Sequence, residues 1–139
     1  MNHYQPIFSS IVLNLVSSNV PAGFPSPAED YVEGKLDLTA LLVQHPGATF
    51  YVRVQGESML GDGIHDKDIL VVDRSLEARQ GDVVIAALHG EFTVKRLMFR
   101  LGQPWLVPSH PAHQAVQITA DMDSLIWGVV TSVIHQFRR

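Results

Sequence analysis

The sequence TFYVRVQGESM, residues 49–59, is the stretch on which the predicted fold depends. Its first seven residues are rich in aromatic and β-branched side chains, which is typical of a β-strand. Gly56 follows, and a glycine lets the backbone turn sharply at the end of a strand. Ser58 therefore stands just beyond a strand end, where its hydroxyl can face the edge of a site and not the core. That position suits a nucleophile.

A second stretch, FTVKRL at residues 92–97, predicts a strand with Lys95 inside an otherwise apolar pattern. Burial would lower the pKa of this lysine toward a neutral amine, which could take a proton from the Ser58 hydroxyl. The alternative is a solvated lysine whose stem lies along the sheet while its ammonium group stays in water. The two stretches alone leave both interpretations open.

The chain from residue 49 onward has a β pattern throughout, and all the strands assigned from the pattern lie there, while a strand in the N-terminal arm stays an open alternative. Short strands separated by Gly, Pro and Asp turns, with a two-residue hairpin turn at residues 89–90, predict curled antiparallel sheets that form a small barrel-like domain. The fold class is therefore mainly β. The predicted strands are 49–55, 69–73, 83–88, 91–99, 105–107, 116–119 and 125–135.

We divide the chain into a removable N-terminal arm, residues 1–22, a linker with short helices, residues 23–48, and a main domain, residues 49–139. The arm contains no Asp, Glu, Lys or Arg. It is predicted to be flexible, and it is either a first strand of the domain or a segment that packs on the body or on a partner. A signal peptide is disfavoured because the arm lacks a positively charged start and Asn14 interrupts its apolar stretch.

Two short helices are predicted in the linker. Ser26 can cap the first, with a proline and an acidic residue in the positions of a capping box, and Gly34 is expected to end it. Asp37 can cap the second helix, which is expected over residues 38–43.

Composition excludes several classes of function. The net charge of −4 comes without a basic stripe, so direct nucleic-acid binding is not expected. The absence of cysteine excludes disulfides, a thiolate nucleophile and Cys-ligated zinc. The longest apolar run, residues 83–88, is far shorter than the roughly 20 residues that a membrane helix needs. These features fit a protein of the cytosol.

No metal or cofactor site is expected. His110 and His113 have a ligand-like spacing, but Pro111 lies between them and prevents a helix from presenting both rings on one face. The acidic, glycine-containing loop at residues 61–68 lacks the ligand order of a calcium loop, and we interpret it as a turn-rich connection.

Three features together resemble the LexA-type serine peptidases: GESM at residues 56–59, FTVK at residues 92–95 and an Ala22-Gly23 bond in the extended, Pro-containing stretch VPAGFP. The runs GFPSPAEDYVE at residues 23–33 and DVVIAA at residues 82–87 look specifically like the UmuD branch. The resemblance covers roughly residues 20 to 135.

The resemblance implies a self-cleaving peptidase with a Ser/Lys dyad. Ser58 would be the nucleophile, Lys95 the general base and Ala22-Gly23 the scissile bond, while the backbone N–H groups around Glu57 and Ser58 would form the oxyanion hole. It also implies a cytoplasmic homodimer whose cleavage is stimulated by a RecA filament. The shortened form would then join a UmuC-type translesion DNA polymerase in SOS mutagenesis.

Other interpretations remain beside this one. A LexA-like repressor is disfavoured because residues 1–22 cannot hold a helix-turn-helix domain. A signal peptidase with the same dyad is also disfavoured, because such enzymes need a membrane anchor and no membrane span is expected here. A non-catalytic β module that only binds a polymerase and a filament stays open.

Overall fold

A computed structural model describes residues 11–16, 32–88, 90–119 and 125–138. The chain divides into two compact units, residues 1–44 and residues 45–139. In the first unit, strand β1 (Val12–Val16) pairs antiparallel with β2 (Val32–Asp37), and the short helix α1 (Leu38–Leu42) follows directly. Asp37 caps this helix, because its carboxylate accepts a hydrogen bond from the Ala40 N–H.

The first unit corrects two expectations. Strands do occur upstream of residue 49: β1 lies within the predicted arm, where a first strand was one of the two alternatives, and β2 lies within the predicted linker, where only helices were expected. The helix that was expected to end at Gly34 lies mostly outside the described residues, and its end, from Val32, is strand β2. Pairing with the apolar residues of β1 overrides the local helix signals there. The second helix is confirmed, one residue shorter than predicted.

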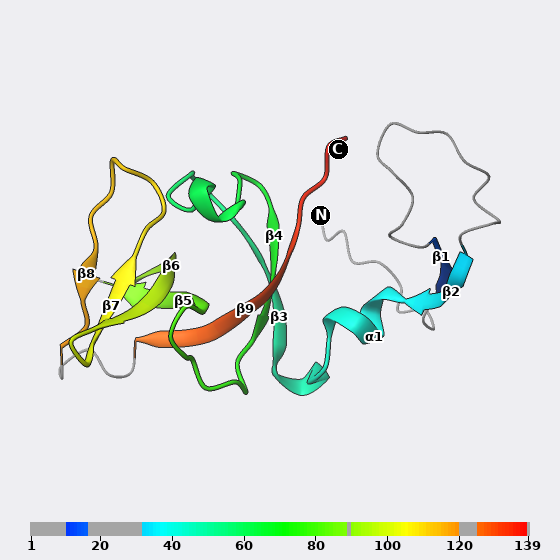
Figure 1. The fold of residues 1–139 in the computed structure, drawn as a ribbon, viewed down its shortest axis with the longest axis horizontal. Helices are drawn as coiled ribbons and strands as arrows, with labels where there is room; N and C mark the ends of the chain where they lie inside the picture. The colour runs from blue at the N-terminus through cyan, green and yellow to red at the C-terminus, as the bar shows by residue number, and fades with distance from the viewer. Residues whose placement is uncertain (1–10, 17–31, 89, 120–124, 139) are drawn as a thin grey trace. The chain divides into compact units, whose positions relative to one another are not determined.

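The second unit contains one seven-stranded antiparallel sheet with the order β3-β4-β9-β5-β6-β7-β8. Figure 1 shows β9 as a long strand between the β3–β4 pair and the strands β5 to β8. Two 3-10 turns, η2 (Pro46–Ala48) and η3 (Leu60–Asp62), flank β3 along the chain. The strands are β3 (Thr49–Arg53), β4 (Ile69–Asp73), β5 (Val83–Leu88), β6 (Glu91–Arg100), β7 (Gln103–Val107), β8 (Val116–Gln117) and β9 (Ile126–Ile134).

The predicted mainly β, antiparallel fold is confirmed, although the sheet is not closed into a barrel. The bounds of β4 and β5 agree with the sequence prediction, and the other strands differ by a few residues at their ends. β5 and β6 form the predicted hairpin, with Leu88 opposite Glu91 and a positive φ of 81° at Gly90. In the part of the chain that the structure describes, no helix is long and apolar enough to cross a membrane.

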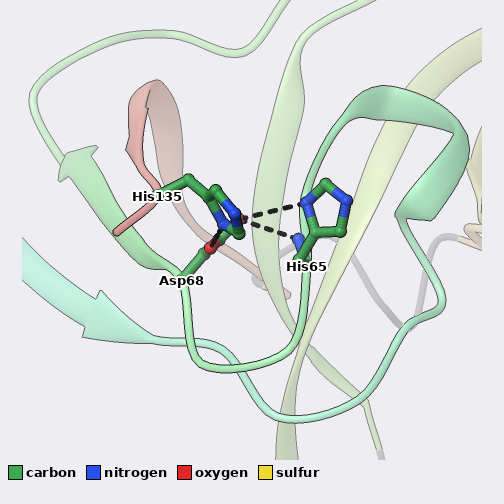
Figure 2. A group of neighbouring side chains, drawn as sticks. All are labelled: His65, Asp68 and His135. Atoms are coloured by element: carbon green, nitrogen blue, oxygen red, sulfur yellow. Dashed lines mark hydrogen bonds and ion pairs between the residues drawn. The ribbon is translucent and has the colours of Figure 1, made fainter. Parts of the chain in front are cut away.

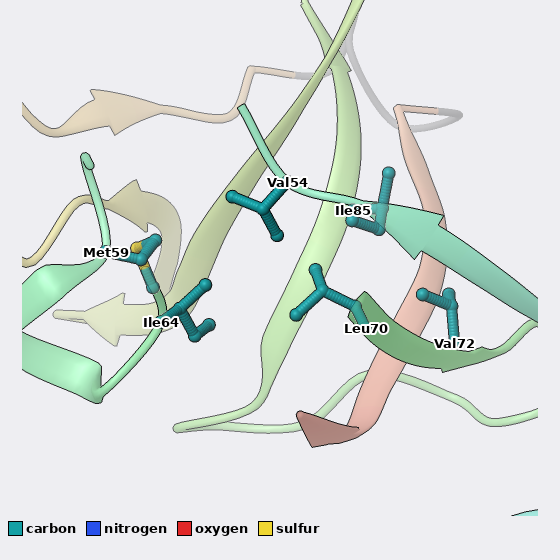
Figure 3. Packing of buried hydrophobic residues seen from close by; sticks show 6 residues of the cluster. All are labelled: Val54, Met59, Ile64, Leu70, Val72 and Ile85. Atoms are coloured by element: carbon teal, nitrogen blue, oxygen red, sulfur yellow. The ribbon is translucent and has the colours of Figure 1, made fainter. Parts of the chain in front are cut away.

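Two hydrophobic clusters form the core of this unit. Alternate residues of β5 point to opposite faces of the sheet, so Ile85 belongs to one cluster while Val84 and Ala86 belong to the other. Figure 3 shows the first cluster, which consists of Val54, Met59, Ile64, Leu70, Val72 and Ile85. Met59 is buried there directly after Ser58, so the packing of this cluster fixes the segment that carries the serine.

Candidate active site

Ser58 and Lys95 meet in the second unit although they are far apart in the sequence. Lys95 Nζ lies 3.2 Å from Ser58 Oγ. Lys95 projects from β6, which is held between β5 and β7, while Ser58 lies in the turn between β3 and η3. A hydroxyl and an amine at this separation are within reach of direct proton transfer.

Two further oxygens hold the Lys95 amine. Nζ lies 2.9 Å from Thr93 Oγ1 and 3.1 Å from the carbonyl oxygen of Val94. A neutral amine has two N–H donors and one lone pair. If the two donors go to Thr93 and Val94, the lone pair is left for the Ser58 hydroxyl proton, which is the arrangement that a general base needs.

The electrostatic surroundings favour the neutral form of this lysine. Burial lowers the pKa of Lys95 from its ordinary value, because a low-dielectric environment disfavours the ammonium form. Among the described residues, no carboxylate forms an ion pair with Lys95, and the ion pairs found lie at His45–Asp73, His65–Asp68, His135–Asp68 and Arg96–Asp62. Within the described part of the chain, no counter-charge therefore opposes the lowering of this pKa.

The turn that carries Ser58 is held by a segment between β7 and β8. Ser109 donates its backbone N–H to the Ser58 carbonyl at 2.9 Å and accepts at its own carbonyl from the Gly61 N–H at 3.0 Å. A Cβ at Gly61 would lie 2.6 Å from the Ser109 carbonyl oxygen, so only glycine allows this approach. At the start of the turn, Gly56 has a φ of 89°, which supports the predicted sharp bend.

An ion pair ties the same turn to β6. Arg96 approaches Asp62 with its guanidinium, with Nη2 2.6 Å from Oδ1 and Nε 3.4 Å from Oδ2, and its Nη1 donates to the Gly81 carbonyl. Asp62 lies in η3, four residues after Ser58, and Arg96 follows Lys95 directly. The pair therefore fixes the η3 segment against the strand that supplies the amine.

A cleft of about 330 Å³ opens beside Ser58. It is lined largely by residues of the β3 end, of the serine turn and of β6: Val52, Arg53, Val54, Gln55, Gly56, Ser58, Met59, Ile85, Phe92, Thr93 and Val94. Phe92 is 65 % exposed, and its ring centroid lies 5.4 Å from that of Trp127. An extended peptide with small or apolar side chains fits the chemistry of these walls.

The predicted oxyanion hole and the predicted scissile bond are the two remaining parts of the site. Among the described residues, none accepts a hydrogen bond from the backbone N–H of Glu57 or of Ser58. Ala22 and Gly23 lie outside the described residues. The roles of these four residues therefore stay predictions.

Sequence interpretation missed three residues of this site, namely Thr93, Ser109 and Phe92. Thr93 had a usable signal, because residues two apart on a strand share a face and the Thr93 hydroxyl could reach the Lys95 amine. Ser109 acts mainly through its backbone and had no comparable signal.

His110 and His113 lie close to each other, with ring centroids 5.3 Å apart, in the loop that follows Ser109.

Residues 14–131 match the family described as Peptidase S24-like. The chain is 50 % identical over 113 residues to Protein MucA of Salmonella typhimurium, an alignment that covers 81 % of this chain and 77 % of that protein. It is 44 % identical over 135 residues to Protein ImpA of Salmonella typhimurium, with 93 % and 88 % covered. It is also 39 % identical over 121 residues to the LexA repressor of Halorhodospira halophila, with 86 % of this chain and 53 % of that repressor covered.

Proposed function

The chain belongs to the S24-like peptidase family, and from this membership we propose that it is a serine endopeptidase that cuts its own chain between Ala22 and Gly23. The resemblance to LexA-type peptidases and to their UmuD branch is confirmed. The observation that carries the proposal is the 3.2 Å separation of Lys95 Nζ from Ser58 Oγ, with no carboxylate of the described residues paired to the lysine.

The proposed reaction has two halves. Neutral Lys95 takes the proton of the Ser58 hydroxyl while Oγ attacks the carbonyl carbon of Ala22, and the resulting oxyanion accepts hydrogen bonds from the backbone N–H groups of Glu57 and Ser58. The ammonium of Lys95 then gives its proton to the Gly23 nitrogen as the peptide bond breaks. Water, deprotonated by Lys95, hydrolyses the Ala22–Ser58 ester and restores both side chains.

Positioning limits such a reaction more than affinity does. The scissile bond is on the same chain or on a second copy, so a segment held in the cleft reacts at a high effective molarity, a gain of up to about 7–11 kcal/mol for well-oriented groups. An activator that holds this segment in place is sufficient and need not supply a catalytic group. We propose that a RecA filament is this activator.

Cleavage would also change the surface of the protein. The scissile bond lies in the sequence between β1 and β2, so the cut separates two paired strands covalently. Loss of β1 would leave the hydrogen-bonding edge of β2 without its partner, and an unpaired strand edge is a template for another chain. We propose that the shortened form, as a cytoplasmic homodimer, uses surface released in this way to join a UmuC-type translesion polymerase in SOS mutagenesis.

The direct test is incubation of the purified full-length protein at alkaline pH, followed by mass spectrometry of the fragments. We expect one new N-terminus at Gly23 in the wild type and none in Ser58→Ala. An uncut wild type, a cut at another bond or a Ser58→Ala variant that cleaves at the wild-type rate would contradict the proposal. Comparison of polymerase binding by the cleaved product and by full-length Ser58→Ala tests the later step, which equal affinities would contradict.

A further inference from the structure

Three side chains outside the proposed catalytic site come together at the end of the sheet where β4 begins and β9 ends. His65 and Asp68 lie in the turn before β4, and His135 follows the last residue of β9. Figure 2 shows the three side chains together, with dashed lines that join Asp68 to both histidines. One potential ligand atom from each residue lies within 4.8 Å of the other two, and this is the one such group found in the described part of the chain.

Asp68 is the fixed member of this group. Its side chain is fully buried, and the backbone N–H of His65 donates to its Oδ2 at 2.8 Å. Its Oδ1 accepts from His135 Nδ1 at 2.5 Å. The backbone of the same residue is also held, because the Asp68 carbonyl accepts from the Val54 N–H at 2.8 Å. Because these hydrogen bonds hold the residue, the orientation of its carboxylate toward the two rings is fixed.

The two imidazoles are more accessible than the carboxylate. The side chain of His65 is 51 % exposed and that of His135 is 34 % exposed, and their ring centroids lie 4.8 Å apart. Partial exposure leaves the rings room to rotate and leaves one side of the group open to water. A metal ion bound here could therefore complete its coordination with solvent.

The donor set fits zinc better than the common hard cations. Imidazole nitrogen and carboxylate oxygen are both zinc ligands, whereas calcium and magnesium select oxygen ligands only. With zinc–ligand bonds of about 2.0–2.1 Å, neighbouring ligand atoms in a tetrahedron lie about 3.3 Å apart. His135 Nδ1 lies 2.5 Å from Asp68 Oδ1 and His65 Nδ1 lies 3.7 Å from the other carboxylate oxygen, Oδ2, while one ligand atom from each residue lies within 4.8 Å of the other two. Metal binding would therefore turn the rings so that both face the same ion.

We propose that His65, Asp68 and His135 form a zinc-binding site, with water as a further ligand. The turn that supplies two of the ligands is hydrogen-bonded to the segment before Ser58, since the Lys67 N–H donates to the Val54 carbonyl and the Gly56 N–H donates to Asp66 Oδ1, both at 2.8 Å. Zinc would thus connect the end of β9 to the backbone that leads into the serine turn.

The test uses tag-free full-length protein, freed of metal with a chelator and titrated with Zn²⁺ by calorimetry at neutral pH. We expect one Zn²⁺ per chain and a melting temperature that rises with zinc concentration, because a ligand that binds only the folded state stabilises it. His65→Gln should weaken binding by about tenfold or more, since loss of even a residue behind the ligands weakens metal sites by about 10–100-fold. The zinc-dependent rise in melting temperature should shrink accordingly.

The chain offers a matched control in its other neighbouring histidine pair. The His110→Gln, His113→Gln double variant removes two imidazoles whose ring centroids lie 5.3 Å apart, against 4.8 Å for His65 and His135, and which have no place in the proposed site. It should keep the wild-type affinity and stoichiometry. Loss of binding in this control, wild-type affinity in His65→Gln or no binding by the wild type would each overturn the proposal.

His135→Gln is a weaker test than His65→Gln, because it also removes a hydrogen bond to the buried carboxylate and could unfold the protein. Co²⁺ therefore serves as a second, spectroscopic probe. We expect the intense visible bands of a four-coordinate Co²⁺ ion in the wild type and their loss in His65→Gln. Weak bands of a six-coordinate ion in the wild type would contradict the proposed site.

Discussion

The second unit contains two partly buried polar groups with opposite arrangements of charge. At Ser58 and Lys95, an amine is buried with hydroxyl and carbonyl oxygens around it and no carboxylate of the described residues. At Asp68, a carboxylate is buried between two imidazoles and a backbone N–H. An ionisable group without a counter-charge tends to lose its charge and becomes available for proton transfer, whereas one with partners keeps its charge and holds segments together.

The pKa directions agree with this contrast. Burial alone lowers the pKa of Lys95, toward the neutral form. Burial pulls the pKa of Asp68 upward, but the hydrogen bonds from the His65 backbone and from His135 hold it below its ordinary value, toward the charged form. We therefore expect substitutions of Lys95 to affect chemistry first and substitutions of Asp68 to affect stability first.

The largest effect is expected for Lys95→Arg. A guanidinium does not lose its proton near neutral pH, so the variant should lack the general base, and self-cleavage should slow by about 10²–10⁴-fold. The measurement is the rate at which full-length protein disappears at fixed pH. Lys67→Arg, which changes an exposed lysine of the same unit, is the control and should cleave normally. Cleavage by Lys95→Arg at the wild-type rate would contradict the role of Lys95 as the general base.

Asp68→Asn should have the largest effect on stability. Both carboxylate oxygens accept hydrogen bonds, and an amide has only one oxygen, so either one donor would face an N–H group or the His135 ring would have to change tautomer. Urea unfolding should show a loss of about 1–3 kcal/mol.

Asp66→Asn is the control for this substitution, because Asp66 lies in the same turn and accepts one recorded hydrogen bond, which an amide oxygen can replace. Its effect should stay within about 0.5 kcal/mol. Because the pKa of Asp68 is lowered on folding, its contribution is present above the unfolded pKa and is lost as the pH falls through the folded pKa. Equal stability of Asp68→Asn and wild type would contradict the structural role.

Thr93→Val should have an intermediate effect on cleavage. It removes the hydroxyl that accepts a hydrogen bond from Lys95 Nζ. Losing a hydrogen bond of about 1 kcal/mol should slow cleavage roughly fivefold. An oxygen acceptor stabilises the ammonium more than the amine, so its loss should also move the midpoint of the pH–rate profile to lower pH. Thr131→Val, whose hydroxyl bonds to the Val71 carbonyl, should change neither quantity. An unchanged midpoint of the pH–rate profile in Thr93→Val would contradict an influence of the Thr93 hydroxyl on the Lys95 amine.

The smallest expected effect is a gain in stability in Lys95→Met. This substitution removes the burial penalty of the amine, and we expect about 0.5–1 kcal/mol at neutral pH. Since the pKa of Lys95 is lowered on folding, the difference from wild type should shrink as the pH rises through the folded pKa toward 10.5. Lys67→Met should be neutral, and a less stable Lys95→Met would show that the amine stabilises the fold.

The sequence predicted the parts of this comparison that depend on local pattern. Short apolar runs rich in β-branched residues located β4 and β5, and Gly56, two residues before Ser58, indicated the bend that its positive φ supports. The pairing of β1 with β2 was missed, because the capping signals near Ser26 favoured a helix and tertiary pairing overrides such signals. The meeting of His65 with His135 was missed too, because β4 and β9 pair across a large sequence separation that no local pattern encodes.

The pH dependence of self-cleavage by the full-length wild-type protein tests the central claim most directly, because a lysine base works only when it is deprotonated. We predict that the rate rises with pH and levels off, with a midpoint below the 10.5 of an ordinary lysine. A rate that stays flat from roughly pH 6 to 10, or a bell-shaped profile centred near pH 7 as expected for a histidine, would contradict the assignment of Lys95 as the base.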